Sequence, residues 1–234
     1  MTLDEFLEQW DADYRKRAEK IPMFDPRKPL LWTWKQWIYF VRVFYHVRGH
    51  FNELVWHLGN MAPTAQLKRM FLANIADEWG LGVPMHNLPS HEELYYRFAG
   101  AVGLDREILI EEEVLREKTY LPFIRKFNHG HIERLKRNSW IYAFALFAAY
   151  ERLDNGDYAR LLKFVTERRG IPGWGRKFFE VHAQVRHFEP TREYLETIWE
   201  DNNTGVVREA FKFIADHQLA VTRKMNAAVN AYRG

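Results

Sequence analysis

The sequence contains no cysteine. Disulfides, thiolate metal ligands, cysteine-held iron–sulfur clusters and a cysteine nucleophile are therefore excluded. Long hydrophobic runs are also missing, because no stretch approaches the roughly 20 apolar residues of a membrane span. Charged residues interrupt segment 1–20, which consequently lacks the apolar region of a signal peptide. We expect a cytoplasmic protein without a membrane partner.

A large excess of charge of one sign is likewise absent. The 34 Lys and Arg residues and 31 Asp and Glu residues leave a formal net charge of only +3. No long basic run stands out, so nucleic acid is not an expected partner. The 234 residues are 47% hydrophobic, which is enough for one substantial core. No linker or internal repeat divides the chain, so we predict a single domain over residues 1–234.

Helical periodicity dominates the sequence, and the alternating pattern of strands is not convincing anywhere. Pro122 is expected to kink or shorten one of the helices, and Thr64 and Ser90 are candidate N-caps. The pattern predicts an all-α fold. The expected helices cover residues 3–20, 32–58, 64–79, 91–100, 106–127, 132–153, 157–169, a segment after 174, 191–200 and 204–232.

Three of these helices carry polar residues on the face that their apolar stripe marks as inward. Glu78 and Asn74 share that face of the third helix. Glu151 continues the stripe of the helix 132–153, and His182 follows two phenylalanines on the next helix but one. Burying a lone carboxylate costs several kcal/mol unless a cation or hydrogen bonds compensate it. Inward carboxylates and imidazole on separate helices are what a metal site in a bundle core requires.

Each residue taken alone also allows a simpler interpretation. A glutamate near a helix end can turn toward solvent or pair with one of the many arginines. If a metal is present, carboxylate and imidazole without thiolate favour iron or manganese over a structural zinc.

The chain resembles the iron-containing, heme-oxygenase-like oxidase and oxygenase family in three stretches. The block from Asn74 to Gly80, followed by His91 and Leu94, is the most specific part of the resemblance. The resemblance implies a heme-oxygenase-like helical bundle of about seven core helices, usually with two irons, that activates dioxygen to oxidise small molecules. The stretches are Phe40–Val47 with Phe51 and Leu54; Asn74–Gly80 with Ser90–Leu94, Phe98 and Gly103-Leu104; and Ala143–Glu151 with Phe178–His182.

By resemblance, four residues match four of the family's six iron ligands: Glu78, His91, Glu151 and His182. The other two ligands normally follow the last histidine at i+4 and i+7, where this chain has Arg186 and Glu189. An arginine keeps its proton and cannot ligate a metal. Glu189 stays a candidate fifth ligand, although Pro190 disfavours helical geometry there. The chain is therefore expected to hold one or two Fe²⁺ ions.

The resemblance predicts an iron-dependent oxidoreductase with dioxygen as co-substrate. Its substrate is expected to be an amino-acid-like or apolar small carboxylate, in a biosynthetic role. Arg186 is the candidate that binds the substrate carboxylate. An external electron donor and a homodimer are compatible with this prediction. The candidate pocket walls are Tyr45, Phe147, Phe178 and Phe179.

Three alternatives stay open. Arg186 could pair with Glu78 or Glu151 in a metal-free pocket, as in an enzyme resembling pyrroloquinoline quinone synthase. The bundle could instead be a non-catalytic scaffold; a thiaminase II is disfavoured because its nucleophile is a cysteine. A competing metal site is offered by His46 and His50 with Glu53 and His57, but helix geometry places them at the edge of the buried side, as solvated or boundary residues.

Overall fold

The computed structural model describes residues 1–25, 27–81, 89–184 and 188–234. Every regular element in these ranges is a helix, which confirms the all-α prediction. Two 3₁₀ turns, Pro22–Phe24 and Pro29–Leu31, precede α2, and α6 continues into a π-helix, Ile110–Leu115. The α-helices are α1 (Leu3–Ala18), α2 (Trp34–Arg48), α3 (Phe51–Met61), α4 (Ala65–Glu78), α5 (His91–Ala101), α6 (Arg106–Leu109), α7 (Pro122–Arg137), α8 (Trp140–Glu167), α9 (Gly173–Gln184), α10 (Phe188–Glu200) and α11 (Thr204–Ala231).

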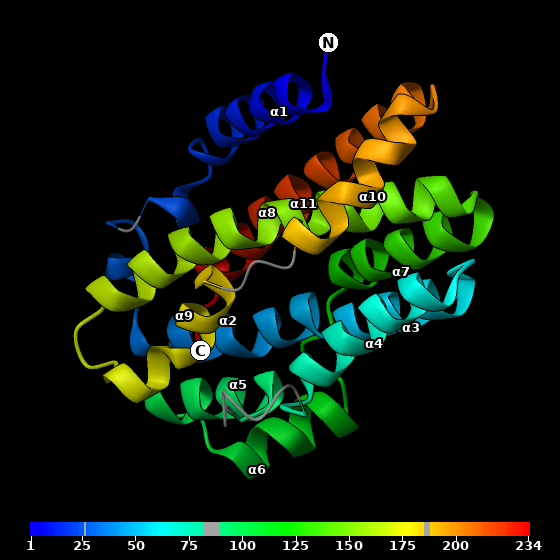
Figure 1. The fold of residues 1–234 in the computed structure, drawn as a ribbon. Coiled ribbons are helices and arrows are strands. Elements are labelled where there is room, and N and C mark those ends of the chain that lie inside the picture. Colours follow the sequence, from blue (N-terminus) through cyan, green and yellow to red (C-terminus); the bar gives the residue numbers. More distant parts are fainter. Residues whose placement is uncertain (26, 82–88, 185–187) are drawn as a thin grey trace.

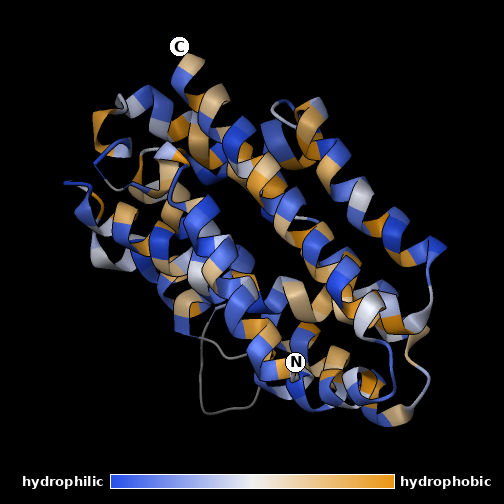
Figure 2. Cartoon of the chain, turned by 90° about the horizontal axis from the view of Figure 1, so that it is seen from above, coloured by the Kyte–Doolittle hydropathy of each residue, from blue (hydrophilic) through white to orange (hydrophobic). Residues whose placement is uncertain are grey.

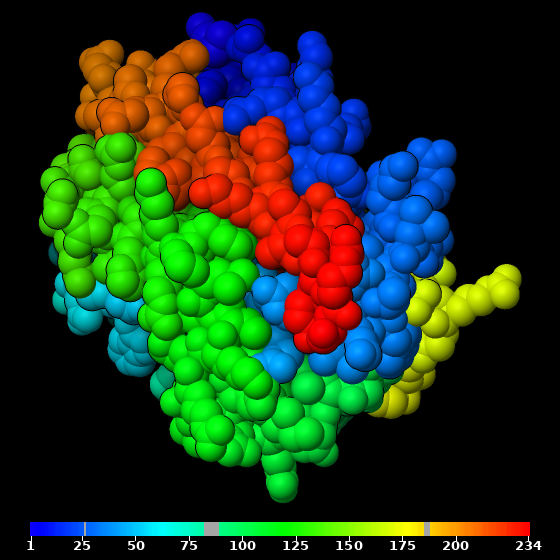
Figure 3. All heavy atoms as spheres, turned by 180° about the vertical axis from the view of Figure 1, so that it is seen from behind, coloured from blue at the N-terminus to red at the C-terminus, as the bar shows by residue number. Residues whose placement is uncertain are grey.

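The two longest helices, α8 and α11, form the centre of the bundle. They pack along one another, and α9 also packs against α8 (Figure 1). Helix α1 lies along one outer edge, whereas α5 and α6 lie at the opposite edge. Seen from behind, α11 crosses the surface between α7 and the N-terminal segments (Figure 3). Hydrophobic and hydrophilic residues alternate along the helices, as amphipathic packing requires (Figure 2).

Short polar side chains fix where the helices of the site begin. The Thr64 hydroxyl accepts a hydrogen bond from the Leu67 backbone N–H at 3.3 Å, and the Ser90 hydroxyl accepts one from Glu93 N–H at 3.1 Å. Both N-caps are those expected from the sequence. Each satisfies a backbone donor that the first helical turn would otherwise leave unpaired.

Aromatic side chains fill much of the core. Trp37 stacks on Phe164 with ring centroids 4.4 Å apart, and Phe40 lies 5.4 Å from Phe44. Each such ring contributes roughly 1.5–3 kcal/mol through burial alone. The donors described next therefore project from a tightly packed scaffold.

Helix boundaries differ from the expectation in several places. The predicted helix 32–58 ends at Arg48 and restarts as α3. The predicted helix 106–127 ends with the π-helix at Leu115, and α7 then runs to Arg137, through the start of the predicted helix 132–153. The rest of that helix joins 157–169 in the single helix α8, despite Gly156. Pro122 begins α7 instead of kinking a helix, since a proline fits the first turn, where its missing N–H has no partner to lose. In the described part of the chain, no helix is both long and apolar enough to cross a membrane.

Candidate metal centre

Four helices bring the predicted ligands toward one point. Glu78 is the last residue of α4, His91 is the first residue of α5, and His182 lies in α9. One ligand atom from each of these three side chains lies within 4.8 Å of the other two. Glu151, from α8, lines the same small cavity. The predicted inward positions of Glu78 and Glu151 are confirmed, with 8% and 2% of their surface exposed.

Contacts within the site orient both histidines. The His91 Nδ1 atom lies 2.7 Å from the Glu78 Oε1 atom. His182 Nδ1 lies 2.7 Å from the Phe178 carbonyl oxygen, so this nitrogen carries the proton and donates. The His182 Nε2 atom is then left with a lone pair for a metal. The two imidazole rings are 4.4 Å apart between centroids.

A fourth helix contributes two carboxylates. Glu151 Oε1 accepts a hydrogen bond from Asn74 Nδ2 at 3.2 Å. Asp154 follows it by three residues on α8, so both carboxylates lie on one face of that helix. They line a cavity of about 10 Å³ with Glu78 and the two histidines, and Phe51 closes part of it. This volume is close to what a single water molecule needs.

Burial disfavours the charged form of two of the three carboxyl groups in the cavity. Burial raises the pKa of Glu151 well above 4.5, and the Asp154 and Glu78 carboxylates raise it further. Burial likewise raises the pKa of Asp154, as do Asp157 and Glu78. Burial acts to raise the pKa of Glu78, but the contact with His91 and the neighbouring His182 and Arg48 outweigh it, so this pKa is lowered. Burial and the nearby His91 lower the pKa of His182 to about 3, so it is a neutral, ligand-competent imidazole.

These residues fit a divalent cation. Three carboxyl groups and two imidazoles around one enclosed cavity supply the oxygen and nitrogen donors of a metal site, and a bound cation would favour the charged form of the carboxyl groups. The donor set is nitrogen and oxygen only, which suits iron or manganese. His182 also has the outer hydrogen bond that metal-bound histidines usually make.

Asp154 was missed by the sequence reasoning. The predicted break between residues 153 and 157 placed Asp154 in a loop, whereas α8 is continuous there. The signal that could have found it is its spacing of three residues from Glu151, which is ligand spacing on a continuous helix.

The structure does not bring Glu189 to the metal centre, which corrects its placement among the ligands. Helix α9 ends at Gln184 and Glu189 lies in the first turn of α10, so the two residues are not seven positions apart on one helix. Glu189 is exposed and lines a different pocket. Arg186, the candidate for substrate binding, lies outside the described residues.

The four predicted pocket walls do not line the cavity, whereas Phe51 does. Phe178 is fully buried with its ring 4.3 Å from His182, so it supports the ligand from behind. Phe147 packs on Phe71 and Phe179 packs on Phe98, both within the core. Tyr45 lies beside the Arg48 guanidinium, 5.3 Å from it.

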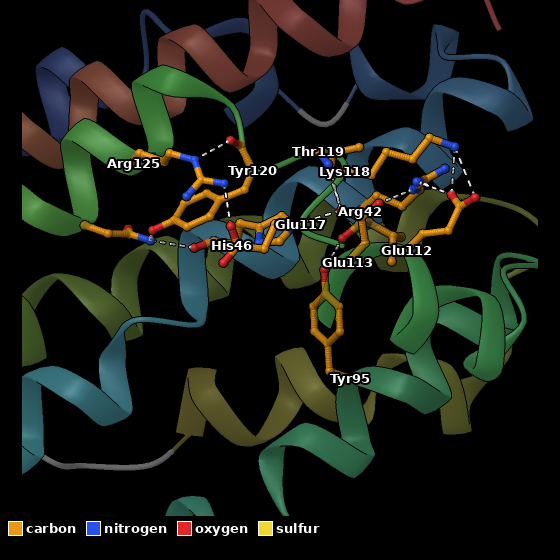
Figure 4. A network of polar contacts seen from close by, with 12 residues as sticks. Arg42, His46, Tyr95, Glu112, Glu113, Glu117, Lys118, Thr119, Tyr120 and Arg125 are labelled. Atoms are coloured by element: carbon orange, nitrogen blue, oxygen red, sulfur yellow. Dashed lines mark hydrogen bonds and ion pairs between the residues drawn. The ribbon is translucent and has the colours of Figure 1, made fainter. Parts of the chain in front are cut away.

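The expectation that His46 and His50 are solvated or boundary residues is wrong. Both are buried, with 7% and 5% of their surface exposed. His46 Nε2 contacts Glu113 Oε2 at 2.8 Å in a network that also includes Arg42 and Thr119 (Figure 4). The π-helix aims Glu113 into this network, so a structural role accounts for His46.

Comparison with known proteins assigns the chain to a family. The model of the family of iron-containing redox enzymes matches residues 38–187. The chain belongs to this family. All the candidate ligands from Glu78 to His182 fall inside the matched region. A search of curated proteins gave no match.

Solved structures agree on the fold. A domain from Shewanella denitrificans, described as having a heme oxygenase-like fold and unknown function, is 15% identical, with a TM-score of 0.67 over 98% of this chain and 92% of that chain. A CADD-like protein of unknown function from Nostoc punctiforme is 14% identical, with a TM-score of 0.65 over 96% of this chain and 99% of that one. The chain therefore has a heme-oxygenase-like fold, as predicted.

Proposed function

We propose that this member of the family is a non-heme iron, dioxygen-dependent oxidase or oxygenase that acts on a small molecule. One observation carries the proposal. Donor atoms of Glu78, His91 and His182 lie within 4.8 Å of one another, at a cavity that two further carboxylates line. Most acids on a bundle are solvated, so three of them around one buried cavity call for a cation.

Glu78, His91 and His182 would hold one iron ion. Glu151 and Asp154 supply further oxygen donors on the α8 side of the cavity, enough to share a second ion. Bound iron would supply the one-electron redox and dioxygen chemistry of such an enzyme.

The protein's own residues orient the ligands and exclude water. The Phe178 carbonyl accepts the His182 Nδ1 proton and so keeps the other nitrogen facing the cavity. Asn155 Nδ2 donates to the His182 carbonyl at 2.9 Å, which ties α9 to α8. Phe51 and the buried Phe178 keep the surroundings apolar, and a low dielectric strengthens each electrostatic contact inside.

Anaerobic ferrous titration of the metal-free protein, followed by elemental analysis, tests the proposal. We expect tight uptake of iron by the wild type and its loss in Glu78→Ala and His182→Ala. Glu53→Ala is a matched control, because that glutamate is exposed on α3. Absence of specific uptake in the wild type, or equal loss in the Glu53→Ala control, would contradict an iron enzyme.

The same titration of Asp154→Ala separates one ion from two. With two ions, the wild type takes up about two irons and Asp154→Ala loses one of them. With a mononuclear centre, the wild type takes up about one and this variant keeps it.

A further inference from the structure

A second hollow of about 300 Å³ opens at the surface beside the metal centre. Helix α1, the middle of α8 and the first turn of α10 form its walls. Its size is at the lower end of the range in which small-molecule sites fall. Neither the predicted ligands nor the predicted pocket walls lie in it, apart from Glu189 at its rim.

Three arginines line this pocket and outnumber its two acidic residues, Asp11 and Glu189. Arg152 contacts Asp11 at 2.8 Å, and Arg160 contacts Asp157 at 2.9 Å. Arg15 is exposed and makes no side-chain hydrogen bond or ion pair with any described residue. Two of the guanidinium groups are thus held in place by carboxylates, while the third is available for an anion.

The same pocket also offers apolar surface. Phe188 and Leu153 are buried except for the part that faces the hollow, with 4% and 5% of their surface exposed. The Arg152 guanidinium lies 4.7 Å from the Phe188 ring centroid, so cationic and apolar surface adjoin. Tyr14 is anchored by its hydroxyl, which donates to Asp157 Oδ2 at 2.6 Å. An anionic group joined to an apolar body complements these walls.

One residue separates the pocket from the metal cavity. Asn155 lines both hollows, and its Nδ2 atom donates to the carbonyl of the candidate ligand His182. Leu153 faces the pocket, whereas Glu151 and Asp154 face the cavity, so α8 forms the shared wall. A molecule in the pocket therefore lies one side chain away from the candidate iron ligands.

We infer that this pocket binds a small carboxylate with an apolar body, held at its charged end by Arg15 and Arg152. That the bound carboxylate is the substrate rests on the proposed function; that the pocket binds carboxylates does not. The pocket selects by charge at the rim and by apolar contact at Phe188 and Leu153.

Binding of 3-phenylpropanoate to the full chain, with and without metal, tests the pocket. Its neutral amide and the corresponding amine are matched probes of the same shape. Titration calorimetry should show that the acid binds at least about tenfold more tightly than either probe. Arg15→Gln should weaken binding of the acid about three- to tenfold, because a charge-assisted contact is lost.

Lys16→Gln is the control, since Lys16 is the next exposed residue on the same helix and does not line the pocket. Equal binding of acid, amide and amine would overturn the inference. So would equal weakening by Arg15→Gln and Lys16→Gln, or no binding of the acid at all.

Nuclear relaxation by bound Mn²⁺ tests whether a molecule in the pocket lies close to the metal centre. When Mn²⁺ occupies the cavity, nuclear relaxation of the bound 3-phenylpropanoate protons should be strongly enhanced, and His182→Ala should abolish the enhancement. Acid binding without enhancement in a Mn²⁺-loaded protein would overturn the substrate role but leave the pocket. Failure of Mn²⁺ to load would count against the proposed function and not against the pocket.

Discussion

At the scale of a single residue, the buried Glu151 carboxyl group suits a metal site but lowers the stability of the metal-free protein. Only 2% of its surface is exposed, and its one described hydrogen bond comes from Asn74. Burial raises its pKa, so the folded metal-free protein resists ionisation of this group. A group with a raised folded pKa contributes stability below its unfolded value near 4.5, and this contribution is lost as the pH rises.

We therefore predict that Glu151→Gln stabilises the metal-free protein. The glutamine carbonyl still accepts from Asn74, while the carboxyl group that must stay protonated or be buried as an ion is gone. The thermal midpoint at pH 7.5 should rise by about 3–6 °C, and the gain should be smaller at pH 5. Differential scanning calorimetry in chelator measures both values.

Addition of Fe²⁺ under anaerobic conditions should reverse the order, because the wild type then gains stability from binding that the variant lacks. Glu53→Gln is the control for removing an exposed carboxylate from a helix. A lower midpoint for metal-free Glu151→Gln would show that the carboxylate is already compensated.

The burial of some candidate ligands can be predicted from the sequence, whereas the position of others depends on the folded structure. Glu78 and Glu151 interrupt apolar stripes, so their burial could be predicted from helical periodicity alone. Asp154 was harder to place, because an Asp-Asn-Gly run is typical of a turn, whereas α8 is helical there and packs against α9 and α11. Glu189 was predicted as a ligand because it follows His182 by seven residues on an assumed single helix, but α9 ends at Gln184.

At the scale of helices, the site depends on how closely α5 approaches α9. These two helices carry His91 and His182. At Gly175 the approach is so close that an added β-carbon would lie 2.3 Å from the Ala101 β-carbon. Gly175 thus has no space for a side chain, and the separation of the two histidines depends on it. A sequence alone does not reveal this need, since it arises from the partner helix.

Gly175→Ala should lower iron affinity without touching a ligand. The added methyl group must push α9 away from α5, which costs about 1–3 kcal/mol of folding stability and moves His182 relative to His91. We expect about tenfold weaker Fe²⁺ binding, the size typical of changes behind a ligand. Competitive titration against a chelator of known affinity measures it.

Gly173→Ala is the matched control on the same helix. Its added β-carbon would find nothing closer than 3.7 Å, at the tip of Arg176. It should leave iron affinity unchanged and stability equal or slightly higher. Equal affinities for Gly175→Ala and Gly173→Ala would show that the α5–α9 spacing does not control the site.

At the scale of the whole molecule, buried histidines join helices that lie far apart in the sequence. His50 precedes α3, His131 lies in α7 and His217 lies in α11. His50 Nδ1 donates to the Val47 carbonyl at 3.1 Å, and its Nε2 accepts from His131 Nδ1 at 2.8 Å. The His131 ring centroid is 5.6 Å from that of His217. Sequence reasoning placed His50 at a helix edge because it assumed one continuous helix through Gly49.

This histidine cluster predicts a loss of stability in mild acid. Burial lowers the pKa of His50 from 6.5 to about 4. Burial and the neighbouring His50 and His217 lower the pKa of His131 well below 6.5. A group with a lowered folded pKa contributes stability above its unfolded value, here 6.5, which is lost as the pH falls toward the folded value. The window is therefore from about pH 6.5 to about pH 4.

His50→Asn isolates the contribution of one member. The asparagine amide can still donate to the Val47 carbonyl but does not titrate. Between pH 7 and pH 5 the free energy of unfolding of the metal-free variant should fall by about 2 kcal/mol less than that of the wild type, at about 1.4 kcal/mol per pH unit below 6.5. Urea unfolding at the two pH values measures this difference. His129→Asn, at an exposed position of α7, should keep the pH dependence of the wild type. An unchanged pH dependence in His50→Asn would mean that the pKa of His50 is the same in the folded and the unfolded protein.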